Sequence, residues 1–108
     1  MKISKFLLII LFSFTIYIQN LSADDAKMLK GLEIFNETAG CAACHILKAA
    51  GSEGNVGPNL DTVSLTVETV KEMVTYGLGV MPAYGEGGML TKEEIDIVSY
   101  FVANSSGK

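Results

Sequence analysis

The stretch CAACH, residues 41–45, is the feature that most constrains this chain. Cys41 and Cys44 are the only cysteines in its 108 residues, and His45, directly after the second, is the only histidine. Several kinds of site use two cysteines at this spacing, and each makes a different demand on the rest of the chain. The surroundings of the motif therefore decide among them.

Three alternatives to haem attachment are weakened by these surroundings. A structural disulfide would close a loop of two residues, contribute little stability and leave His45 without a role. A thioredoxin-like redox pair lies at a helix start after a strand, whereas here a helical pattern precedes the motif and a glycine-rich segment follows it. A zinc site needs four ligands, and the chain offers only three strong sulfur or imidazole ligands.

Covalent haem attachment explains all three residues together. Two thiols separated by two residues add to the two vinyl groups of one haem, and the following imidazole coordinates the iron. We therefore interpret CAACH as the attachment site of a c-type haem.

Residues 1–23 are typical of a secretory signal peptide. Lys2 and Lys5 precede an apolar run, 6–18, and the segment ends in the small residues Ser22 and Ala23. Thirteen helical residues would rise about 20 Å, less than the roughly 30 Å of a hydrocarbon core, which favours cleavage after Ala23 over a retained anchor. Because the chain has no arginine, we expect export through the general secretory pathway to the periplasm, where residues 24–108 form a single domain.

The mature chain is acidic. Removing Lys2 and Lys5 leaves 6 lysines against 12 acidic residues, a formal charge of −6. Nucleic acids and anionic membrane surfaces require clustered cations, so neither is an expected partner. We expect membrane contact only through redox partners, or through the N-terminal segment if it is retained.

Two helices are predicted from apolar residues at spacings of three and four. The first begins at Asp24 and Asp25, which supply the N-cap and first-turn carboxylates, and ends by Gly40. Its expected buried face comprises Met28, Leu29, Leu32 and Phe35. The second runs from about Thr66 to Tyr76 and stops at Gly77. Its expected stripe comprises Val67, Val70, Met73 and Val74.

The third predicted helix has the clearest start, because Thr91 and Glu94 have the spacing of a capping box. Its expected buried residues are Ile95, Val98, Phe101 and Val102, and the tail NSSGK is expected to fray. Between the second and third helices, residues 77–88 hold five glycines and a proline, which neither a helix nor a central strand tolerates. The predicted class is all-α, with loops wrapped around a bound group.

A low-spin haem iron needs a second axial ligand, and with one histidine the strong remaining type is a methionine thioether. Met28 and Met73 lie in helical stripes, where core packing explains them. Met89, just before the Thr91 cap, is the rival to Met81, which lies in the loop GVMPAYG where no packing stripe accounts for it. A His/Met pair raises the reduction potential and leaves no open position on the iron, which indicates electron transfer rather than catalysis.

The motifs CAACH, VGPNL and GVMPAYG, followed by a C-terminal helix ending in YFVANS, resemble in that order the small class I cytochromes c of bacteria. The resemblance covers residues 27–104, about the whole mature chain. It implies the cytochrome c fold, with three main helices and glycine-rich loops around one covalently attached haem. It also implies thioether bonds at Cys41 and Cys44, with His45 and Met81 as proximal and distal iron ligands.

Further positions match the family pattern. The carbonyl of Pro58 is expected to accept a hydrogen bond from the proximal imidazole, and Leu60 is expected to pack on the haem. Gly31 and Phe35 are expected where the first helix crosses the last, near Ile97 and Tyr100. Unlike the best-known relatives, this chain has no tryptophan and no lysine-rich face. The haem propionate partners are therefore unassigned: Tyr76, Tyr84 or Lys48 could serve, but ordinary surface or haem-edge packing explains each of them better.

The leading functional hypothesis is a diffusible periplasmic one-electron carrier between redox proteins, such as a dehydrogenase, an oxidase or another cytochrome. The alternative is a haem-bearing electron-transfer subunit of a larger periplasmic or membrane redox enzyme. A third hypothesis, ligand sensing or peroxidase-like catalysis, requires an open distal position on the iron.

Overall fold

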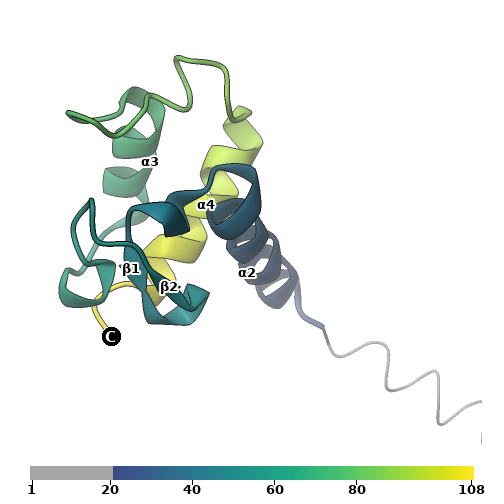
Figure 1. Ribbon diagram of the computed structural model, residues 1–108. Helices are drawn as coiled ribbons and strands as arrows, with labels where there is room; N and C mark the ends of the chain where they lie inside the picture. Colours follow the sequence, from purple (N-terminus) through teal and green to yellow (C-terminus); the bar gives the residue numbers. More distant parts are fainter. Residues whose placement is uncertain (1–20) are drawn as a thin grey trace, which may run out of the picture.

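The computed structural model, which describes residues 21–108, contains three α-helices joined by loops and short turns (Figure 1). They are α2 (Ala23–Glu33), α3 (Val67–Tyr76) and α4 (Lys92–Ser105). The predicted signal segment lies outside the described residues up to position 20. Within residues 21–108, no helix combines the length and the apolar character needed to cross a membrane.

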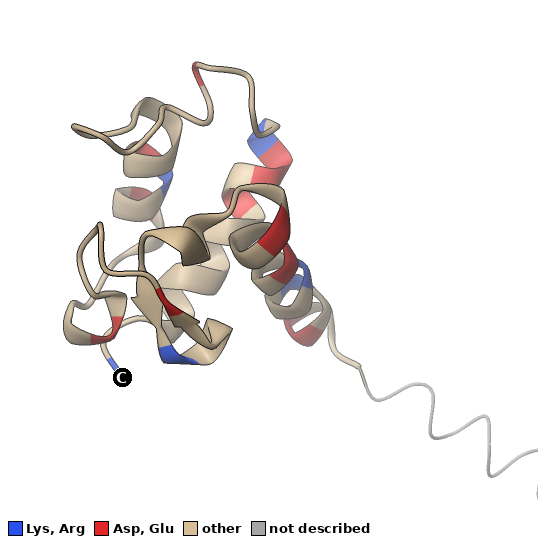
Figure 2. Ribbon diagram, viewed as in Figure 1, with Lys and Arg blue, Asp and Glu red and all other residues tan. Residues whose placement is uncertain are grey.

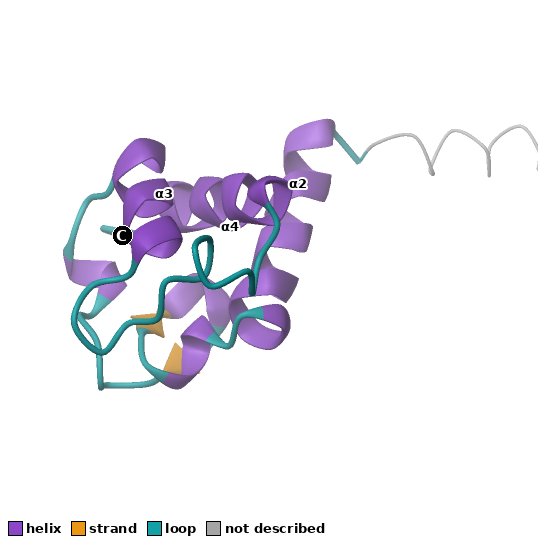
Figure 3. Ribbon diagram, turned by 90° about the horizontal axis from the view of Figure 1, so that it is seen from above, coloured by secondary structure: helices purple, strands orange, loops and turns teal. Residues whose placement is uncertain are grey.

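The connections are short turns and a small ladder. The short helical turns are Ile34–Thr38 (η1, a π-helix), Cys41–Ala43 (η2), Lys48–Ala50 (η3) and Leu60–Thr62 (η4), the last three of the 3₁₀ type. Strands β1 (Ile46–Leu47) and β2 (Ser52–Glu53) pair antiparallel, with Ile46 opposite Glu53 and Leu47 opposite Ser52. Seen from above, the two short strands and most of the loops lie on one side of α3 and α4 (Figure 3). The predicted all-α class is confirmed, with a two-residue ladder as an addition.

The start of α2 differs from its prediction. Ser22 is the N-cap, and its hydroxyl accepts a hydrogen bond from the Asp25 amide at 3.2 Å, while Asp24 and Asp25 occupy the first turn. Leu29, expected on the buried face, is 57% exposed. The reason is that the face toward α4 contains Gly31, and Leu29 lies two residues away, about 200° around the helix.

The crossing of α2 and α4 is confirmed and is closer than a side chain would allow. A Cβ atom placed on Gly31 would overlap the Cβ of Phe101 and lie 3.0 Å from the carbonyl oxygen of Ile97. Beside it, the rings of Phe35 and Phe101 meet edge to face with centroids 5.8 Å apart. Lys27 lies over the ring of Tyr100, 4.4 Å from its centroid. The missing side chain at Gly31 lets the two backbones approach directly.

Helices α3 and α4 begin and end near the predicted residues. Thr66 caps α3 through the Thr69 amide, and Gly77, with φ 69°, ends it. At α4 the capping box is complete, because the Glu94 amide donates to the Thr91 hydroxyl at 3.1 Å and the Glu94 carboxylate accepts from the Thr91 amide at 2.8 Å. An ion pair between Lys71 and Asp96, 2.8 Å apart, joins the two helices.

The C-terminal tail corrects one prediction. Residues 104 and 105 belong to α4, Ser105 and Ser106 are buried, and the Gly107 amide donates to the carbonyl of Leu60 at 3.0 Å. The tail is therefore anchored against η4 rather than frayed, because that carbonyl offers its backbone a partner.

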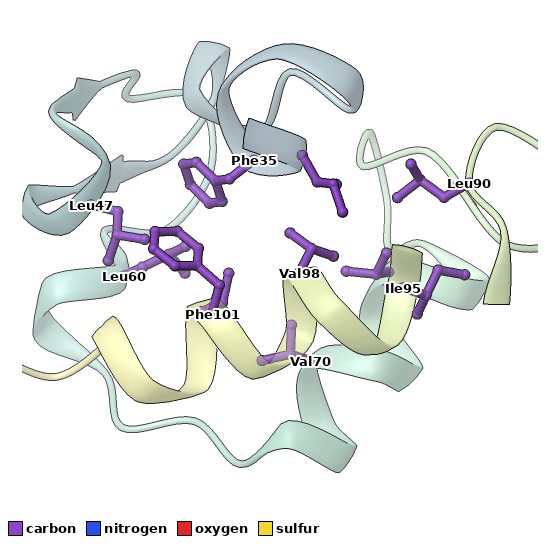
Figure 4. Close-up of a cluster of buried hydrophobic side chains, with 11 residues drawn as sticks. Phe35, Leu47, Leu60, Val70, Leu90, Ile95, Val98 and Phe101 are labelled. Carbon is purple, nitrogen blue, oxygen red and sulfur yellow. The ribbon is translucent and has the colours of Figure 1, made fainter. Parts of the chain in front are cut away.

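The core lies along the inner face of α4 (Figure 4). Phe35, Leu47, Leu60 and Phe101 gather toward one end, and Val98, Ile95 and Leu90 toward the other. All four residues expected to be buried on α4 are buried. Leu90, directly before the Thr91 cap, is 5% exposed whereas Met89 is 52% exposed, so Leu90 and not Met89 packs at the helix start.

Candidate functional site

The attachment motif forms one tight turn. Gly40 enters it with φ 68°, and the amides of Cys44 and His45 both donate to the carbonyl of Cys41, at 3.1 and 3.0 Å. Positions three and four apart on such a turn share one face. Both thiols are free, and the two cysteines and His45 line the same cavity.

This cavity has a volume of about 430 Å³, within the range of about 300–1,000 Å³ common for cofactor pockets. Its walls come from the motif, the loop before η4, α3, the loop after α3 and the inner face of α4. Among the described residues that line it there is no aspartate, glutamate or lysine, and Figure 2 shows the charged residues mainly on the helices. Such a lining suits a large apolar ring and not a charged ligand.

The His45 ring is held by the segment Gly57–Pro58. Its Nδ1 atom lies 2.8 Å from the carbonyl oxygen of Pro58. A carbonyl only accepts, so Nδ1 carries the proton and Nε2 keeps a free lone pair for a metal. A Cβ on Gly57 would lie 2.5 Å from the ring atom Cε1, and the Gly57 amide donates to the Cys44 carbonyl at 2.7 Å. The backbone of Gly57 therefore packs directly against the imidazole.

Ser52 anchors the chain on the other side of His45. Its buried hydroxyl donates to the His45 carbonyl at 2.8 Å and accepts from the Leu47 amide at 3.0 Å. The Asp61 carboxylate accepts from the Lys48 amide at 3.0 and 3.1 Å. The loop that follows the motif is thus fixed by side chains where regular structure is short.

Met81 is held by a narrow turn after α3. The amides and carbonyls of Leu78 and Met81 exchange hydrogen bonds of 3.0 and 3.2 Å, and Gly79 between them has φ 58°, as the first central residue of such a turn requires. A Cβ on Gly77 would lie 2.5 Å from the Met81 carbonyl oxygen, so only glycine fits there. Met81 lines the cavity, and its rival Met89 does not.

Other expected positions are placed as follows. Pro58 and Leu60 both line the cavity, and Leu60 is 8% exposed. Of the three possible propionate partners, Tyr84 lines the cavity, whereas Tyr76 and Lys48 do not. Met73, expected as core filler, is 39% exposed and lines the cavity, because α3 turns this side of its apolar stripe toward the cavity rather than toward α4.

Two positions of the site were not predicted. Gly57 precedes Pro58 in VGPNL, and a glycine there could have indicated close backbone approach. Ser52 carried no such signal, because its role depends on the pairing of β1 with β2, which two-residue strands do not reveal in sequence.

Burial raises the pKa of the Cys41 thiol to about 11. The free thiol is therefore protonated at neutral pH in the folded chain and packs as a small apolar group. Burial likewise raises the pKa of the Tyr84 hydroxyl.

The donor set fits a c-type haem. Two free thiols, an imidazole with its Nε2 lone pair available and a thioether line a single uncharged cavity. These are the groups that attach the macrocycle and bind a low-spin iron from two sides.

Comparison with known proteins agrees with this chemistry. Residues 26–102 match the family described as cytochrome C oxidase, cbb3-type, subunit III. The chain is 34% identical over 89 residues to cytochrome c6 of Leptolyngbya boryana, and the aligned region covers 77% of this chain and 98% of that protein. It is also similar to the crystal structure of the c-type cytochrome SorU from Sinorhizobium meliloti, with 43% identity and a TM-score of 0.71 over 78% of this chain and 95% of that one.

The match to the family extends over most of the chain and includes the turn with both thiols, the imidazole and the residues of α3 and α4 that line the cavity. The chain belongs to this cytochrome family, as a small class I cytochrome c that carries a covalently bound haem and transfers electrons.

Proposed function

We propose that this cytochrome carries single electrons in the periplasm, with Cys41 and Cys44 as the thioether residues and His45 and Met81 as the axial ligands. The observation that carries the proposal is that one uncharged cavity is lined by all four side chains. The haem supplies an iron that gains and loses one electron. The chain supplies its attachment, its orientation and a low-polarity surrounding.

The ligand roles rest on local geometry. The Pro58 carbonyl orients the imidazole and increases its basicity, which strengthens it as a ligand. The turn 78–81 holds Met81 on the cavity wall through two backbone hydrogen bonds. If His45 and Met81 both bind the haem iron, it would have no open position for a substrate, so the proposed protein is a carrier and not an enzyme.

The proposed mature protein is residues 24–108, a single monohaem domain. Cleavage after Ala23 would remove the Ser22 cap of α2. The first-turn carboxylates Asp24 and Asp25 would then stabilise the N-terminal end of the helix without a cap. N-terminal sequencing of the exported protein measures this directly.

A permanent subunit of a larger redox enzyme is the second proposal, because the matched family is described as an oxidase subunit. The rim of the cavity exposes apolar side chains, with Leu78 68% and Val80 88% exposed. Such a rim suits contact with another redox protein in either case. Purification of the native protein as a free monomer would contradict the subunit proposal.

The test of the ligand assignment is Met81→Ala, with Met89→Ala as its matched control. Met81→Ala is expected to leave the haem attached, abolish the methionine-to-ferric-iron absorption band, lower the reduction potential and allow carbon monoxide to bind the reduced protein at neutral pH. Met89→Ala is expected to change none of these. An unchanged spectrum and potential in Met81→Ala would show that another group is the ligand.

A further inference from the structure

Tyr84 links three parts of the chain that meet around the cavity. Its amide donates to the carbonyl of Val74 in α3 at 2.9 Å, and its carbonyl accepts from the amides of Met89 and Leu90, ahead of α4, at 2.9 and 3.1 Å. Its hydroxyl donates to the carbonyl of Ala39 at 3.1 Å. The backbone groups of Tyr84 bond to residues close to it in the chain, whereas its hydroxyl bonds to a residue 45 positions earlier.

The acceptor lies next to the attachment motif. Ala39 follows η1 and precedes Cys41 by two residues, and within residues 21–108 no backbone amide donates to its carbonyl. The donor lies three residues after Met81, in the loop that joins α3 to α4 (Figure 1). The Tyr84 hydroxyl therefore ties the loop that carries Met81 to the segment that carries the two thiols.

Among residues 21–108, the other long-range hydrogen bonds of this loop run to α3 and not across the cavity, with the Gly85 amide donating to Val74 at 3.4 Å and the Glu86 amide to Thr75 at 3.1 Å. The turn 78–81 is closed by its own hydrogen bonds, and Val80 at its tip is 88% exposed. Tyr84 itself is half-buried and lines the cavity. Movement of Met81 away from the cavity would move Pro82 and Ala83 as well, and would lengthen the hydrogen bond between the Tyr84 hydroxyl and the Ala39 carbonyl.

The geometry points to Tyr84 as a positioning residue, whose hydroxyl acts as a latch that keeps the Met81 loop closed against the attachment segment and so holds Met81 on the iron. This inference rests on the proposed ligation by Met81. The latch would lower the population of molecules in which Met81 has left the iron, without touching the iron itself.

An external ligand such as imidazole binds the ferric iron only in that open population, so its apparent affinity scales with the open fraction. The net contribution of one neutral hydrogen bond corresponds to a change of about two- to tenfold in such a population. Tyr84→Phe removes the hydroxyl and keeps the ring, which leaves the packing against the cavity in place.

The experiment is an imidazole titration of the ferric holoprotein at neutral pH, followed by the methionine-to-iron band. Tyr84→Phe is expected to bind imidazole about two- to tenfold more tightly than wild type and to lose the band at correspondingly lower imidazole. The matched control is Tyr76→Phe, because Tyr76 is 60% exposed and does not line the cavity. It is expected to behave as wild type.

A second pair of variants separates the latch from the ligation. Met81→Ala is expected to bind imidazole far more tightly than wild type, and adding Tyr84→Phe to it should change the affinity by less than about twofold, because the latch acts through Met81. If Met81→Ala binds more tightly but Tyr84→Phe equals wild type, the latch is refuted and the ligation stands. The latch would also be refuted if Tyr84→Phe changed the imidazole affinity equally with and without Met81. If Met81→Ala bound imidazole no more tightly than wild type, both the ligation by Met81 and the latch would be refuted.

Discussion

Replacement of Gly31 by alanine sets two effects against each other. In an ordinary helix interior the change stabilises by about 1 kcal/mol, because glycine loses more backbone entropy on folding. At this position the new methyl group would overlap the Cβ of Phe101 and lie 3.0 Å from the Ile97 carbonyl oxygen. Neither atom is the end of a flexible side chain, so the overlap can be relieved only by moving α2 away from α4.

The magnitude follows from what that movement disturbs. The helices must separate by about 1 Å to restore ordinary contact, which weakens the packing of Phe35 on Phe101 and of the buried residues around them. Overpacking of this kind costs about 1–3 kcal/mol, and rigid neighbours favour the upper half of that range. After the gain in helix propensity, we expect a net loss of about 1–2 kcal/mol, or a fall in Tm of about 5–15 °C.

The assay is unfolding of the holoprotein by heat and by guanidinium, followed by circular dichroism. Ala26→Gly, at an exposed position in the first turn of the same helix, tests propensity alone and is expected to destabilise by at most about 0.5 kcal/mol, because Ala26 is only the third residue of the proposed mature chain. A Gly31→Ala protein as stable as wild type, or more stable, would refute the argument that close helix approach requires this glycine.

Three further predictions concern the imidazole, a helix cap and an ion pair. Gly57→Ala would place a Cβ 2.5 Å from the His45 ring, so we expect a loss of about 1–3 kcal/mol in unfolding free energy and an altered low-spin spectrum; an unaltered spectrum would contradict the contact. Thr91→Ala removes half of the capping box and should cost about 1 kcal/mol in denaturant unfolding, against no change for the neighbouring exposed Lys92→Ala. The hydrogen bond from Lys71 holds the pKa of Asp96 below its ordinary value of 3.8. The ion pair therefore stabilises the fold fully at pH values above 3.8, and this contribution is lost as the pH falls through the lowered pKa. The small Tm difference between wild type and Asp96→Asn should therefore shrink from pH 7 to pH 3, and a constant difference would show that the charge is not its cause.

Much of the site was predictable because its chemistry is local in the chain. Cys41, Cys44 and His45 lie within one turn, so their spacing alone places them on one face. The helix starts at Thr66 and Thr91 were predicted to the residue, because a cap depends only on residues two or three positions away. The start at α2 was missed by two residues because Ser22 and Asp24 are chemically similar caps.

What periodicity could not predict is which side of a helix faces which neighbour. Leu29 and Met73 were both assigned to buried stripes, and one points to solvent while the other lines the cavity. The tail was expected to fray because its composition is polar, but the carbonyl of Leu60 holds it.

The cofactor chemistry, the three helices and the family pattern could be predicted from the residues alone, because they depend on residue types at short fixed spacings. The folded structure was needed to show that Met73 lines the cavity, that Gly57 lies against the imidazole, and that the Tyr84 hydroxyl meets Ala39. Each of these joins segments distant in the chain. Such contacts follow from the packing of α3, α4 and the attachment segment around a common cavity, which short spacings in the sequence do not reveal.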